Sequence, residues 1–258
     1  MLVEDIIKTL EELAPPELAF GWDNVGLMVG DKKKNIKKVL FALDCTEEVL
    51  DEAVKEKAQL IVTHHPFIFR PLKNLDYEAP ITKRILKAVK EDIAIYSAHT
   101  NLDIAQGGTN SVLFDLLSLK DEEPLAEEKG LYIGKIGVLQ ESISFKSFIE
   151  LVKTKLHLDH LTVNGDINKK IKKIGLCTGS GGEYIYTAFK KGCDAYITGD
   201  VGYHDAQLAW ELGICLIDAT HYATEVIVAK ALSEYVSSKH KNLECIVSKV
   251  NSQTLHIV

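Results

Sequence analysis

The chain has 258 residues, of which 46% are hydrophobic and 26% charged, and its formal net charge is −7 at pH 7. This balance is typical of a soluble protein large enough for one large domain or two smaller ones. The acidic charge disfavours a nucleic-acid partner, no apolar run approaches the ~20 residues of a membrane span, and the N-terminus does not resemble a signal peptide. We therefore expect a cytoplasmic protein with no membrane partner.

Hydrophobic periodicity predicts helices and strands that alternate along the chain, which indicates an α/β fold. In the first half, helices are expected at 3–14, 46–57, 82–90 and 110–119, and strands at 39–43, 60–63 and 93–97. In the second half, helices are expected at 147–156, 183–190, 206–212 and 220–237, and strands at 132–139, 161–163, 174–178, 195–198, 214–217, 246–250 and 255–258. The acidic, proline-containing segment 121–130 is interpreted as a linker.

The two halves of the chain are related by an internal duplication. Residues 30–65 align without a gap with residues 165–200, and they share the strand–helix–strand pattern and several identical residues. We therefore predict two related α/β lobes, residues 1–124 and 125–258, around a pseudo-twofold axis. The C-terminal helix, expected at 220–237, could pack back on the first lobe.

Two adjacent histidines, His64 and His65, follow the predicted strand 60–63 and precede Pro66. In α/β sheets, ligands bind at the carboxyl ends of the strands. Adjacent side chains of an extended segment point to opposite sides, so the pair suits two metal ions, one each, if the chain bends there. The alternative is a pair of loop histidines with no ligand.

Each lobe also has a histidine and a carboxylate four residues apart after a later strand. On a helix, this spacing places both side chains on one face. We expect such pairs to meet in a cleft between the lobes, and the converging metal ligands are then His64, His65, Asp103, His221 and Glu225, with His99 beside them. Three imidazoles and two carboxylates suit zinc, iron, manganese or nickel, and five ligands suit two ions better than one. Taken singly, each residue could instead be a capping or solvated surface group.

Other residues are candidates for further roles at this site. His99 and His204 could transfer protons, and His204 lies in the loop that the duplication matches to the histidine pair. Trp22, Asp23 and Asn24 could line a substrate pocket. The alternative for these three is a structural turn anchored by the tryptophan.

Five ordered motifs resemble the NIF3 family, whose members are also catalogued as GTP cyclohydrolase 1 type 2 and its homologs. The motifs are Gly21-Trp22-Asp23-Asn24-x-Gly26, Thr63-His64-His65-Pro66, His99 to Asp103, Thr198-Gly199-Asp200 and His221-x-x-x-Glu225. The resemblance implies two α/β lobes with a dinuclear metal site between them, assembled as a ring-shaped homohexamer. It implies that the metal ligands are the same five residues. Only the resemblance assigns Glu225 as the carboxylate that bridges the two metal ions.

The resemblance also implies a function. In the family's assigned reaction, water adds at C8 of GTP, the imidazole ring of the purine opens, formate leaves, and rearrangement gives dihydroneopterin triphosphate. Two alternatives use the same residues: a non-catalytic metal-binding, trafficking or interaction protein, and a metal hydrolase that acts on damaged nucleotides. The sequence does not separate them, because specificity depends on the shape and loop contacts of the site.

Overall fold

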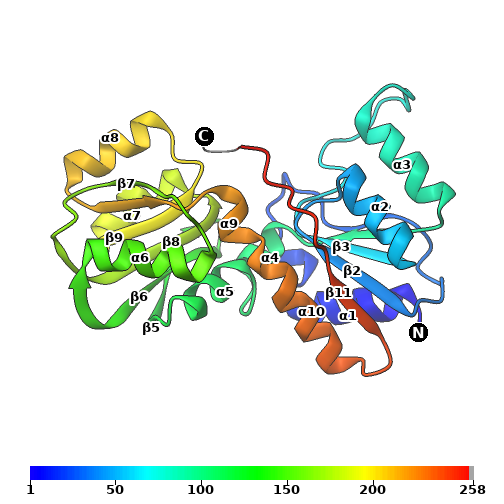
Figure 1. Cartoon of the computed structure of the whole chain (residues 1–258), viewed down its shortest axis with the longest axis horizontal. Coiled ribbons are helices and arrows are strands. Elements are labelled where there is room, and N and C mark those ends of the chain that lie inside the picture. The colour runs from blue at the N-terminus through cyan, green and yellow to red at the C-terminus, as the bar shows by residue number, and fades with distance from the viewer. Residues whose placement is uncertain (256–258) are drawn as a thin grey trace. The chain divides into compact units, whose positions relative to one another are not determined.

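The computed structural model describes residues 1–255, and these residues form two units of mixed α/β structure (Figure 1). Unit 1 comprises Met1–Gln106 and Val228–Thr254, and unit 2 contains Gly107–Ile227. The boundary expected between residues 124 and 125 falls inside a strand of unit 2, β5 (Lys120–Glu128). Most of the C-terminal helix α10 (Ile227–Lys239) belongs to unit 1. No helix in the described part of the chain has the length and apolar character to cross a membrane.

Unit 1 is built on a five-stranded sheet in the order β1-β4-β3-β2-β11, with only β1 antiparallel to its neighbour. The strands are β1 (Gly26–Val29), β2 (Lys38–Ala42), β3 (Leu60–Thr63), β4 (Ala94–Ser97) and β11 (Glu244–Val247). The helices before α10 are α1 (Val3–Leu13), η1 (Pro16–Leu18), α2 (Glu47–Glu56), α3 (Pro80–Lys90) and α4 (Thr100–Ile104). Leu40, Ile61 and Ile95 pack with residues of α2 and α3 in one buried cluster, which holds the two helices against the sheet.

Unit 2 is built on a six-stranded sheet in the order β5-β6-β8-β9-β10-β7, in which β8, β9 and β10 are parallel. The remaining strands are β6 (Leu131–Ser144), β7 (Thr162–Asn164), β8 (Lys170–Ser180), β9 (Ala195–Gly199) and β10 (Cys215–Asp218). The helices are α5 (Thr109–Leu116), α6 (Phe145–Leu156), η2 (Gly182–Tyr184), α7 (Ile185–Lys190), α8 (Tyr203–Leu212) and α9 (His221–Glu225). Phe145, Phe148 and Ile174 are fully buried in its core.

The strand order confirms the internal duplication. The order β1-β4-β3-β2 in unit 1 is repeated as β7-β10-β9-β8 in unit 2, with the same parallel and antiparallel pairings. The carboxyl ends of β3 and β9 are thus equivalent positions, and α4 and α9 follow equivalent strands. In both units, the candidate site residues follow the carboxyl ends of the parallel strands.

Three expectations about secondary structure need correction. The segment 121–130 is not a linker, because its greater part is strand β5, which pairs with β6 and buries Leu125. Its charged residues are exposed on an edge strand, where charges discourage pairing with other chains.

The helix expected at 220–237 is two helices, α9 and α10, and the break coincides with the passage of the chain from unit 2 to unit 1. Of the strand expected at 255–258, residues 256–258 lie outside the described residues, and Leu255 is not in a strand.

Candidate metal centre

Unit 1 gathers three histidines at the carboxyl ends of β3 and β4. His64 and His65 follow β3, whose four residues are all buried, and His99 follows β4. The Thr63 hydroxyl donates to the carbonyl of His65 at 2.8 Å, which turns the chain directly after the strand. One nitrogen from each of His64, His65 and His99 lies within 4.8 Å of the other two. The bend required for the adjacent histidines to act at one site is therefore present.

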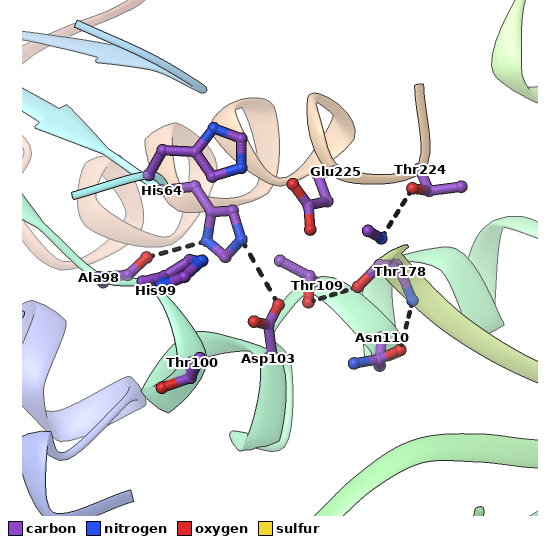
Figure 2. Close-up of polar contacts among 12 residues, drawn as sticks. His64, Ala98, His99, Thr100, Asp103, Thr109, Asn110, Thr178, Thr224 and Glu225 are labelled. Atoms are coloured by element: carbon purple, nitrogen blue, oxygen red, sulfur yellow. Dashed lines mark hydrogen bonds and ion pairs between the residues drawn. The ribbon is translucent and has the colours of Figure 1, made fainter. Parts of the chain in front are cut away.

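The rings of His64 and His65 are each held through Nδ1. The Nδ1 of His64 lies 2.9 Å from the carbonyl oxygen of Ala98, and the Nδ1 of His65 lies 2.7 Å from Oδ1 of Asp44. Because a carbonyl oxygen only accepts, the Nδ1 of His64 carries a proton, and Nε2 is the ring nitrogen that remains available to a metal ion. Figure 2 shows this ring between Ala98 and Asp103, with Nε2 at 3.5 Å from Oδ1 of Asp103.

His99 differs from the expected arrangement. It precedes α4 as its N-cap residue, and its Nδ1 lies 2.9 Å from Oδ1 of Asp23 rather than beside Asp103. The helical spacing argument therefore does not apply to His99 and Asp103, because His99 lies outside α4. Asp23 also accepts hydrogen bonds from the backbone N–H and the hydroxyl of Thr100, at 3.0 and 2.6 Å. Burial by itself raises the pKa of Asp23, but the hydrogen bonds from His99 and Thr100 outweigh it and lower this pKa to about 2.

Unit 2 contributes His221 and Glu225, the first and last residues of α9. The Nε2 of His221 lies 3.0 Å from Oε2 of Glu225, so the predicted proximity across one helical turn is confirmed. The Nδ1 of His221 lies 2.7 Å from Oδ2 of Asp200. Thr63 pairs with Ser97 in unit 1, and the equivalent Thr198 pairs with Asp218 in unit 2, so Ser97 and Asp218 are equivalent. His221, three residues after Asp218, therefore corresponds to Thr100 and not to His99. The two histidine–carboxylate pairs are therefore not related by the duplication.

Two glycines allow the strand ends of unit 2 to approach α9. A Cβ at Gly179 would lie 2.1 Å from Oε1 of Glu225, and a Cβ at Gly199 would lie 2.5 Å from the backbone nitrogen of His221. Gly179 also donates its backbone N–H to the Thr224 hydroxyl at 3.0 Å. Glu225 is only 3% exposed, and its carboxylate fills the space beside Gly179. No side chain fits at Gly179 or Gly199 without a clash with α9.

The Gly199 contact predicts a stability defect. We expect Gly199→Ala to lower the free energy of unfolding by about 1–3 kcal/mol, because its Cβ meets rigid backbone of α9. Gly21→Ala is the matched control, since a Cβ there meets nothing within 4 Å and neither glycine has a positive φ. Urea unfolding should show a lower midpoint for Gly199→Ala and an unchanged or slightly higher one for Gly21→Ala. Equal midpoints for the two variants would contradict the close packing of β9 on α9.

The remaining predicted residues are less closely tied to the ligands. His204 is exposed in the first turn of α8, where its ring contacts that of Tyr203, and no contact joins it to His221 or Glu225 in the described part of unit 2. Trp22 is 61% exposed, and its ring lies 6.2 Å from that of His99. Asn24 donates through Nδ2 to the carbonyl oxygen of Ile68.

Sequence reasoning gave no site role to Asp44, and it named Asp200 only within a family motif, although their carboxylates hold His65 and His221. Both lie just after the carboxyl end of a strand, β2 and β9 respectively. The duplication aligns Asp200 with His65, and this was the signal that could have drawn attention to it. No comparable pattern marks Asp44, whose role depends on the pairing of β2 with β3.

A separate cavity of about 400 Å³ lies in unit 2. Residues of β7, α8 and β10 line it, among them Asn164, Ala206, Trp210 and Asp218. None of the predicted site residues lines this cavity. It is therefore distinct from the cluster around His221.

Comparison with known proteins gives consistent relatives over the whole chain. The family model described as Duf34/NIF3 (NGG1p interacting factor 3) matches residues 1–254. A Clostridium perfringens protein named GTP cyclohydrolase 1 type 2 homolog is 41% identical, over 96% of this chain and 97% of its own. A Bacillus cereus protein related to NIF3 has a crystal structure with a TM-score of 0.91 and 29% identity, covering 100% of this chain and 99% of that one. Reduced HcgD from Methanocaldococcus jannaschii has a TM-score of 0.84 and 34% identity, covering 97% and 98%.

Proposed function

The chain belongs to the Duf34/NIF3 family, and we propose that it is a hydrolase that uses two divalent metal ions. The ligands in this proposal are His64, His65, Asp103, His221 and Glu225. One observation carries it: each of the three imidazoles has Nδ1 fixed by an oxygen acceptor, namely Ala98 O, Asp44 or Asp200. Metal-ligating histidines are typically oriented in this way by a carbonyl or carboxylate behind the ring.

The donor set fits a divalent cation. Nε2 of His221 and Oε2 of Glu225 are 3.0 Å apart, and Nδ1 of His221 is already directed at Asp200. With Nδ1 directed at Asp200, the contact between Nε2 and the Glu225 carboxylate is favourable when a proton or a metal cation lies between or beside the two atoms. A metal ion meets this need with the nitrogen and oxygen donors that zinc, iron, manganese and nickel accept.

We propose that the ligands of the two units act on the same pair of ions, with Glu225 as the bridging carboxylate. The duplication of the fold and the membership of the family support this proposal. Two divalent ions held by these residues would supply activated water and would stabilise developing negative charge. The chain's own groups position the ions through Asp44 and Asp200, and they move protons through His99.

His99 is the better candidate of the two proposed proton-transfer groups. Its Nδ1 bonds to Asp23, whose carboxylate is kept ionised by three hydrogen bonds, and this fixes the orientation of the ring. Its ring centroid lies 5.2 Å from that of His64 and 5.8 Å from that of His65. A histidine held by a carboxylate is a common general base, and here it lies beside the proposed ligands.

For the substrate, we propose GTP, with water added at C8, opening of the purine ring, release of formate and rearrangement to dihydroneopterin triphosphate. The name of the Clostridium perfringens relative supports this choice. The test is incubation of the protein with GTP and zinc, iron, manganese or nickel. We expect formate release and pterin fluorescence with at least one metal and neither after chelation. Stoichiometric metal binding without turnover of GTP would favour the trafficking or interaction role, and turnover only of damaged nucleotides would favour the third alternative.

We also propose that copies of the chain assemble as a homohexamer. The family resemblance supports this assembly. Light scattering should give six times the chain mass of 28.6 kDa. A monomer at micromolar concentration would contradict it.

The carboxylates behind the histidines yield a further prediction. Asp44→Asn and Asp200→Asn remove the negative charge behind His65 and His221 but preserve the shape of the side chain. Loss of such a partner typically weakens metal binding by about 10- to 100-fold. Competition with a chromogenic chelator measures the affinity, and Asp166→Asn, at an exposed turn, is the control. Unchanged affinity in both test variants would mean that the two carboxylates do not orient metal ligands.

A further inference from the structure

An exposed aromatic cluster lies next to the histidines of unit 1. It consists of Phe20, Trp22 and Phe69, and we call it the aromatic cluster. The ring of Trp22 is stacked with that of Phe20 at 5.8 Å and meets that of Phe69 edge-on at 6.1 Å. Trp22 is nevertheless 61% exposed and Phe69 44% exposed. Contiguous apolar surface that stays open to water is a feature of binding sites for ligands and partners.

The loop that carries Trp22 is anchored on both sides. The backbone N–H of Asp23 donates to the carbonyl oxygen of Phe20 at 2.9 Å, and the buried carboxylate of Asp23 is bound by His99 and Thr100. Asn24 ties the same loop to the segment that carries Phe69 through its bond to Ile68. The exposed ring of Trp22 is thus presented in a fixed position, and a ligand that binds it does not have to order the loop.

The aromatic cluster is connected to the proposed metal ligands through His99. The centroid of the His99 ring lies 6.2 and 6.4 Å from those of Trp22 and Phe69. It also lies 5.2 and 5.8 Å from the ring centroids of His64 and His65. A planar ring that stacks on Trp22 therefore lies next to the group that we propose for proton transfer. Arg70, exposed and adjacent to Phe69 in the chain, adds positive charge to this segment.

We propose that the aromatic cluster is the subsite that stacks the nucleobase of the substrate, with Trp22 as its main contact. The chemistry of the cluster selects a flat π-system, because the rings offer faces and edges rather than a set of hydrogen-bonding groups. The choice of GTP as the probe rests on the proposed function. The stacking itself is a binding property, and it can be measured without turnover.

The two tryptophans of the chain allow a direct test, because Trp22 belongs to the aromatic cluster and Trp210 lines the cavity of unit 2. In Trp210→Phe, Trp22 is the single reporter, and we expect GTP to quench its fluorescence saturably while inorganic tripolyphosphate does not. In Trp22→Phe, Trp210 is the reporter, and we expect no quenching. Trp22→Ala should weaken GTP binding about 5- to 150-fold, measured by calorimetry, because base–aromatic stacking contributes on this scale. Trp22→Phe should lose less, because it retains a ring.

Several results would overturn the inference. These are quenching of Trp210 in place of Trp22, equal quenching by tripolyphosphate, or unchanged GTP affinity in Trp22→Ala. Loss of the oligomer in Trp22→Ala with unchanged affinity would assign the aromatic cluster to a subunit interface and also overturn it. Failure of the proposed reaction looks different: Trp22 would still report GTP binding, but no metal would support formate release. Formate release that is indifferent to Trp22→Ala would leave the reaction standing and remove the subsite.

Discussion

Replacing His65 or Glu225 with alanine is expected to remove most of the bound divalent metal and, with it, any turnover of GTP. His65 is one of two adjacent imidazoles at the end of β3, and Glu225 lies 3.0 Å from the ring of His221 at the end of α9. Loss of a group that only orients a ligand already weakens metal binding by about 10- to 100-fold. Loss of a ligand itself should therefore weaken metal binding by more than ~100-fold. Elemental analysis of protein purified without chelators should fall from ~2 ions per chain to less than one.

His160→Ala is the matched control for these substitutions. His160 is exposed and belongs to none of the histidine groups described above, so its loss should leave the metal content unchanged. Glu225→Gln separates charge from volume, because the amide fills the same buried space beside Gly179 but binds a cation poorly. Full metal content in both His65→Ala and Glu225→Gln would contradict the proposed ligand set.

His99→Gln is expected to lower kcat for GTP by about 10²- to 10⁴-fold, the range typical for the loss of a general acid or base. The metal content should stay at the wild-type level, because His99 is bound to Asp23 and is not one of the proposed ligands. The effect should fall on kcat far more than on KM, since the substitution removes a proton-transfer group and preserves a polar side chain of similar reach. Initial rates of formate release give both constants.

His204→Gln is the informative comparison for this prediction. His204 is exposed on α8 and contacts Tyr203, so the proposal gives it no part in proton transfer. If His204→Gln lowered kcat by two orders of magnitude while His99→Gln did not, the assignment of the proton-transfer group would be reversed. A loss of metal in His99→Gln would instead make His99 a ligand.

The features that could be predicted from the sequence are those that depend on local patterns. The apolar, β-branched run 60–63 predicts strand β3 with the bounds observed, and the helix expected at 46–57 matches α2, whose N-cap Thr46 accepts from the Val49 N–H. The gap-free duplication predicted two equivalent sheets, because a shared strand–helix–strand pattern constrains strand order in both. The proximity of His221 and Glu225 followed from helical spacing alone.

The features that could not be predicted depend on contacts between distant segments. Asp44 lies 21 residues before its partner His65, and Asp200 lies 21 residues before His221, so neither contact has a local signature. Segment 121–130 was misread because acidic composition is shared by linkers and by exposed edge strands, and only pairing with β6 separates the two. The contact of His99 with Asp23 has no local signature either, because spacing alone does not fix where α4 begins and His99 proves to be its N-cap residue.

The central claim is that five side chains of this chain hold two divalent ions. Anomalous diffraction from crystals of metal-loaded protein, recorded above and below the absorption edge of the metal, tests it most directly. The account predicts two peaks per chain, each ~2.0–2.2 Å from ligand atoms drawn from His64, His65, Asp103, His221 and Glu225. Peaks at other residues, or a metal-soaked crystal with no ordered peak at these five, would contradict it.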